Sequence, residues 1–165
     1  DSTPTLLMES VFVLECLAPE KWNADRFLPP TPIRIVINHR GNPELGKDGR
    51  FIAMPNTLRN GPAHLIPDFT EIRGLIQPMA QASESLASKQ ASELKQFAIG
   101  MMHEKLSREI QRLESLAKVN ATIRQEELSL LRKEQLNLEN RLDQAIFRLD
   151  SIRLIWKGDM ERLKN

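Results

Sequence analysis

The sequence predicts an α+β fold in which a small antiparallel sheet is followed by a long antiparallel helical hairpin resembling a coiled coil. Nine of the 10 prolines precede residue 70, and proline interrupts helices. Apolar residues alternate with polar ones early in the chain, whereas they recur every three or four residues near its end. We therefore expect a strand- and loop-rich part over residues 1–66 and the hairpin over residues 67–165, together forming one domain.

Two segments of the first part have the period of two that half-buried strands show. The first covers residues 6–16, with Glu9 and Glu15 on its polar face, and the second covers residues 32–38. A proline-rich connection over residues 18–31 separates them, and residues 50–54 are a candidate for a short third strand. Because two strands alone are marginally stable, helices of this chain or strands preceding residue 1 are needed to complete the sheet.

The second part has helical spacing from about residue 67 onward. In the first helix, apolar residues follow one another mostly at steps of three and four, which predicts a buried face: Leu94, Phe97, Ala98, Met101, Met102, Leu106, Ile110, Leu113 and Ala117. After a turn near residues 118–122, Thr122 and Gln125 resemble a capping box. Alternating steps of three and four then continue to Trp156, with Gln135 as the polar exception. They predict a structural seam of Leu128, Leu131, Leu138, Leu142, Leu149 and Ile152.

Composition argues against several classes of function. The 23 basic and 22 acidic residues leave a net charge of +1, which does not favour a polybasic nucleic-acid binder. The single cysteine, Cys16, indicates a reducing, cytoplasmic location. No apolar run is long enough to span a membrane, so we expect no membrane among the partners. The three histidines lack the spacing of metal ligands. We expect no catalytic, cofactor-binding or metal-binding residue in this segment.

The remaining signals favour contact with other macromolecules. Trp22 lies in a loop, Asn120 lies in the interhelical turn, and Arg148 and Arg153 belong to a set of arginines that either dock an acidic protein surface or simply remain solvated. Two alternatives stay open. The seam could pair between two chains and form a homodimer, or the arm could bind nucleic acid weakly by placing its basic side chains along phosphates.

Three ordered runs resemble the RapA family of bacterial RNA polymerase-associated, Swi/Snf-like ATPases. They are FLPPTPIRI at 27–35, LESLAKVN at 113–120 followed by Ile123 and Arg124, and RLDSIRLI at 148–155. The order and spacing match the C-terminal domain of the family, although Ala121 replaces a usual proline and residues 156–165 extend past the usual end. The start at Asp1 agrees with an excised part of a longer protein.

The resemblance implies a non-catalytic domain of an ATP-dependent factor for polymerase recycling. The two helicase-like ATPase lobes of the family, with their ATP and magnesium, would lie upstream, and none of their motifs occurs here. The implied partners are the other domains of the parent protein and the RNA polymerase core, while DNA would be reached through the parent rather than through this segment. Trp22, Asn120, Ile123, Arg124, Arg148 and Arg153 are the candidate interaction residues.

Overall fold

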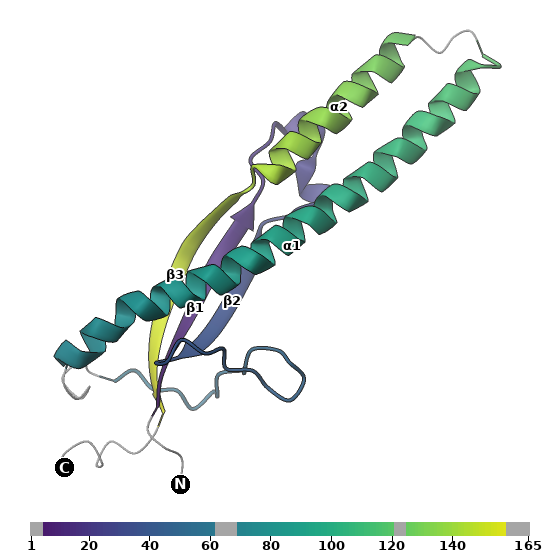
Figure 1. Ribbon diagram of the computed structural model, residues 1–165. Helices are drawn as coiled ribbons and strands as arrows, with labels where there is room; N and C mark the ends of the chain where they lie inside the picture. Colours follow the sequence, from purple (N-terminus) through teal and green to yellow (C-terminus); the bar gives the residue numbers. More distant parts are fainter. Residues whose placement is uncertain (1–4, 62–68, 121–124, 158–165) are drawn as a thin grey trace. The chain divides into compact units, whose positions relative to one another are not determined.

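The computed structural model describes residues 5–61, 69–120 and 125–157 (Figure 1). The elements follow the order β1 (Thr5–Glu15), η1 (Glu20–Trp22), η2 (Ala24–Arg26), β2 (Thr31–Asn38), α1 (Phe69–Ala117), α2 (Gln125–Asp143) and β3 (Ile146–Lys157). The three strands form one antiparallel sheet in the order β2-β1-β3, so β1 is the central strand. The predicted α+β class, with its helical hairpin, is confirmed.

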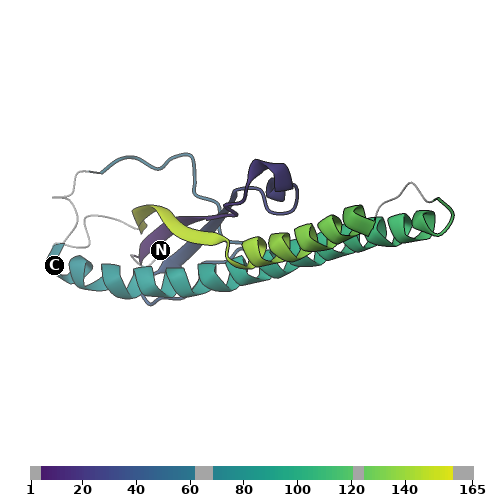
Figure 2. The same ribbon diagram turned by 90° about the horizontal axis from the view of Figure 1, so that it is seen from above.

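The chain divides into two compact units. Residues 5–12, 33–61, 69–89 and 149–157 make the first, here called the sheet unit. Its core follows the period of two: Leu6, Met8 and Phe12 of β1 are buried, and so are the three isoleucines of β2. The first half of α1 lies along this face of the sheet (Figures 1 and 2) and contributes the buried side chains of Ile72, Met79 and Ala87.

A tight turn after β2 reverses the chain, as the sequence predicts at Gly41. Gly41 has a φ of 79°, which L-residues rarely adopt, and the Asn38 side chain accepts hydrogen bonds from the backbone N–H groups of Arg40 (3.0 Å) and Asn42 (3.2 Å). The prediction of a short strand at residues 50–54 is wrong, because only an isolated β-bridge between Leu45 and Phe51 forms there.

Residues 13–32, 90–120 and 125–148 make the second unit, here called the hairpin unit. Lys95 Nζ donates to the carbonyl of Asp143 (2.9 Å), and His103 Nε2 lies 3.1 Å from Glu139 Oε2. Residue numbers thus rise along α1 as they fall along α2, so the helices are antiparallel (Figure 1). Between them lies a narrow apolar seam that includes Ala98, Met102, Leu106, Ile110, Leu128, Leu138 and Leu142, all buried, while Leu131 is half-buried.

The polar exception in the seam has partners on the facing helix. Gln135 Nε2 lies 3.0 Å from His103 Nδ1 and 3.1 Å from Ser107 Oγ. A part-buried amide needs such partners, because leaving it unsatisfied costs about 1–3 kcal/mol. These two contacts explain why a glutamine is tolerated where leucine is expected.

The seam does not continue to Trp156 as predicted. Residues 146–157 form β3, and Leu149 and Ile152 are 48% and 41% exposed. Helix α2 ends at Asp143, whose carbonyl the Lys95 ammonium satisfies. The following residues, rich in isoleucine and aromatics, suit a strand equally well, and pairing with β1 satisfies the backbone groups of that central strand. The third strand of the sheet is thus a C-terminal segment of this chain, whereas from the sequence we expected helices of this chain or strands preceding residue 1.

The predicted buried face of the first helix also needs a correction. Phe97 is 67% exposed and Met101 is 45% exposed, whereas Ala98 and Met102, one position further along, are buried. One residue is a rotation of about 100° on a helix. Because the seam facing α2 is narrow, it takes only one of each adjacent apolar pair and leaves the other in solvent.

Candidate interaction site

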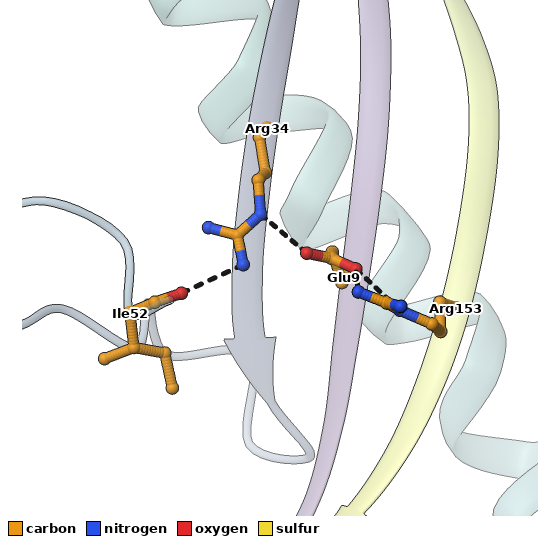
Figure 3. A network of polar contacts seen from close by, with 4 residues as sticks. All are labelled: Glu9, Arg34, Ile52 and Arg153. Carbon is orange, nitrogen blue, oxygen red and sulfur yellow. Dashed lines mark hydrogen bonds and ion pairs between the residues drawn. The ribbon is translucent and has the colours of Figure 1, made fainter. Parts of the chain in front are cut away.

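One of the predicted interaction residues, Arg153, belongs to an ionic cluster around the buried Glu9 within the sheet unit (Figure 3). Glu9 of β1 accepts hydrogen bonds from Nε of Arg34 on β2 (2.6 Å) and from Nε of Arg153 on β3 (2.7 Å). Nη2 of Arg34 also donates to the carbonyl of Ile52 (2.9 Å). Arg153 is therefore paired within its own sheet, while its side chain stays 54% exposed.

The position of Glu9 explains this cluster. Its side chain is only 9% exposed, on the sheet face where Leu7 and Val36 are also buried. A carboxylate removed from water needs charged or strong hydrogen-bond donors, and the two guanidinium groups supply them from both neighbouring strands. The cluster thus ties β2, β1 and β3 together through one side chain. The sequence places Glu9 on the polar face of the first predicted strand. The one hint of a partner is Arg34 on the second predicted strand, because the spacing over residues 146–157 predicts a helix.

The other predicted interaction residues that the structure describes do not gather at one place. Arg148 Nε donates to Glu15 Oε1 (3.2 Å) in a more exposed ion pair. Trp22 is half-buried in η1, with the Lys21 ammonium 5.8 Å from its ring centroid. Asn120 is exposed just after α1, and its N–H donates to the carbonyl of Leu116 (2.9 Å). Ile123 and Arg124, like Thr122 of the expected capping box, lie outside the described residues.

A groove of about 550 Å³ lies in the hairpin unit, between the η2 region and α1. Arg26 and Phe27 form one wall, and six α1 residues form the other: Met101, Glu104, Lys105, Arg108, Glu109 and Arg112. The Arg26 guanidinium lies 4.6 Å from the Phe27 ring centroid and 3.8 Å from Glu134 Oε1. Sequence reasoning did not identify this groove, because nothing in the local pattern connects residues 26–27 with α1.

Cys16 does not have the surroundings of a reactive thiol. It is buried, and its Sγ lies 3.4 Å from the carbonyl oxygen of Arg141. Burial raises the pKa of the thiol, and the nearby Asp25 carboxylate raises it further, while Arg141 partly opposes them. Among the described residues, no His, Cys, Asp and Glu side chains group into a potential metal site, and none of the helices meets the length and apolarity of a membrane span.

These observations define an α+β domain that contains a helical hairpin and a small sheet whose strands are connected by ion pairs. Residues 2–157 match the family described as the RNA polymerase recycling family, C-terminal. The chain belongs to this family, as its resemblance to the RapA family predicts. RNA polymerase-associated protein RapA of Proteus mirabilis (strain HI4320) and its counterpart of Erwinia tasmaniensis are each 34% identical to it over 152 residues. The match covers 92% of this chain and 16% of each relative.

Proposed function

We propose that this chain is the non-catalytic C-terminal domain of a longer, cytoplasmic, RNA polymerase-associated factor, and that it acts through protein–protein contact. The observation that carries the proposal is the family match over residues 2–157 together with two relatives that are named for association with RNA polymerase. In this proposal ATP and magnesium bind in upstream lobes, which also contact DNA, and the present domain contacts those lobes, the polymerase core or both.

The structure of the hairpin unit supports a role in contact. The antiparallel helices present exposed charged side chains on their outer faces, and large apolar side chains such as Phe97 and Leu130 are 67% exposed. Exposed apolar side chains of this kind on a rigid helix are suited to recognition of another protein. The sheet unit, in contrast, uses Arg34 and Arg153 internally, so we do not place the contact there.

Binding to core RNA polymerase tests the proposal. The 165-residue chain is immobilised, and core polymerase is titrated over it while surface plasmon resonance records the response. Saturable binding, or a loss of polymerase affinity when this domain is deleted from a full-length family member, is the expected result. If the chain does not bind and deletion leaves the affinity unchanged, the contact with polymerase is excluded and the interdomain role alone survives.

Self-association through the helices is the alternative. It has less support, because Leu128, Leu138 and Leu142 are buried within their own chain. Sedimentation velocity over a wide concentration range separates the two hypotheses. A persistent monomer removes the homodimer, and a dimer that dissociates when Leu130 is replaced by Asp would establish it.

A further inference from the structure

One face of α1 changes from apolar to basic along its length. Phe97, Met101, Lys105, Arg108 and Arg112 succeed one another at steps of four, four, three and four, so their side chains share one stripe of the helix. All five are exposed, and the stripe is separate from the seam that faces α2. Its length is about 22 Å at 1.5 Å per residue. We call these five residues the α1 stripe.

Four residues of the stripe, Met101, Lys105, Arg108 and Arg112, line one wall of the 550 Å³ groove, and the opposite wall is preorganised. Phe97 lies one helical turn before Met101 on the same stripe. Phe27 is 8% exposed, so its ring is fixed by packing, and it holds the Arg26 guanidinium at 4.6 Å. Arg26 is further restrained by its ion pair with Glu134. A ligand entering the groove therefore meets side chains that lose little conformational freedom on binding.

The groove carries basic charge that the fold leaves unused. Arg108 is paired with Glu104 four residues before it. Within the part of the chain that the structure describes, Lys105 and Arg112 form no ion pair. These two exposed cations lie on the same stripe as two exposed apolar side chains, an arrangement that suits a ligand with carboxylates and one large apolar anchor.

We propose that the α1 stripe and the Arg26–Phe27 wall bind an acidic polypeptide segment that carries an aromatic or large aliphatic anchor. The anchor contacts Phe97 and Met101, while acidic side chains contact Lys105 and Arg112. A protein segment fits better than nucleic acid, because Glu104 and Glu109 also line the groove. The carboxylates of a peptide can be spaced to contact Lys105 and Arg112 and to avoid these glutamates, whereas a phosphate follows at every nucleotide. The inference rests on the proposed role in protein contact and adds the chemistry of the partner.

A peptide-binding experiment tests the inference without polymerase, so its outcome is independent of the polymerase assay. The probe is a fluorescein-labelled, glutamate-rich peptide of about ten residues with one central tryptophan, long enough to span the stripe at about 3.3 Å per residue. Fluorescence anisotropy is recorded with the 165-residue chain. The same peptide with serine in place of tryptophan tests the anchor, and an oligothymidylate of similar length tests nucleic acid.

Two charge-reversed variants give a matched comparison. Lys105→Glu with Arg112→Glu alters the stripe, whereas Lys118→Glu with Lys133→Glu makes the same change in net charge at exposed lysines outside the groove. We expect the stripe variant to weaken binding at least about tenfold and the control to change it less than about twofold. Phe97→Ser should remove the preference for the tryptophan peptide over the serine peptide. Circular dichroism verifies that each variant is folded.

Three results would overturn the inference. The first is equal weakening by both charge-reversed variants, which would indicate general attraction between opposite charges. The second is tighter binding of the oligothymidylate than of the peptide, with loss in the stripe variant, which would make the groove a nucleic-acid surface. The third is an absence of saturable peptide binding to the folded chain.

Discussion

Replacing Glu9 by Gln isolates the contribution of the ionic cluster around this buried side chain to the stability of the sheet. The substitution keeps the size of the side chain but removes its charge, and it turns one acceptor into an N–H₂ group facing a guanidinium. Glu9 accepts two charge-assisted hydrogen bonds, at 2.6 and 2.7 Å, and each bond of this type contributes about 1.5–3 kcal/mol when both partners are buried.

Solvent exposure of the arginines lowers that figure. The side chains of Arg34 and Arg153 are 34% and 54% exposed, so water partly screens both pairs and can rehydrate either guanidinium after the substitution. We therefore expect Glu9→Gln to lower the free energy of unfolding by about 2–3 kcal/mol. Glu15→Gln breaks the analogous pair with Arg148, in which the glutamate is 28% exposed, and should cost less than about 1 kcal/mol.

Urea unfolding followed by circular dichroism measures both variants. Fluorescence of Trp156, three residues beyond Arg153 on the same strand, provides a reporter in the sheet unit once Trp22→Phe removes the other tryptophan. A double-mutant cycle between Glu9→Gln and Arg153→Gln should give a coupling energy of about 1 kcal/mol or more. If Glu9→Gln costs no more than Glu15→Gln, the cluster does not stabilise the sheet and our reasoning is refuted.

Three further predictions address the hairpin, the backbone and the thiol. Leu142→Asp should lower the unfolding free energy by several kcal/mol, because Leu142 is fully buried. Leu130→Asp, at a site 67% exposed, should change it by less than about 0.5 kcal/mol. Equal effects of the two variants in urea unfolding would show that the seam is not the interface between the helices. Gly100→Ala should raise the melting temperature, since the added Cβ meets nothing within 4 Å and alanine favours a helix over glycine by about 1 kcal/mol. Gly41→Ala should lower the melting temperature, because Gly41 has a positive φ. Shifts of the same sign in the two variants would contradict this prediction. The folded pKa of Cys16 is raised, so its contribution to stability is complete below the ordinary pKa of 9.0 and is lost as pH rises through the higher folded pKa. The unfolding free energy should consequently fall more steeply above pH 9 than in Cys16→Ala, and parallel pH profiles would disprove it.

Elements whose patterns are local can be predicted from the amino-acid sequence alone. Alternation over residues 6–16 and 32–38 predicts β1 and β2, since a buried sheet face requires a period of two. Helical spacing predicts α1 and α2, and the buried Leu138 and Leu142 agree with the proposed seam. The run 27–35 and its two companions were sufficient to indicate the family, which the match over residues 2–157 confirms.

Contacts between distant parts of the chain select which of several compatible patterns each segment follows. Residues 146–157 have apolar side chains that suit a helix seam or a strand, and the unpaired edge of β1 selects the strand. Glu9 appears polar and solvated in the sequence, yet two arginines from different strands make its burial possible. Phe97 and Ala98 are both apolar, but the narrow contact with α2 accommodates the smaller one and leaves the larger one exposed beside the groove. In each case the deciding contact comes from residues distant in sequence, which local periodicity does not encode.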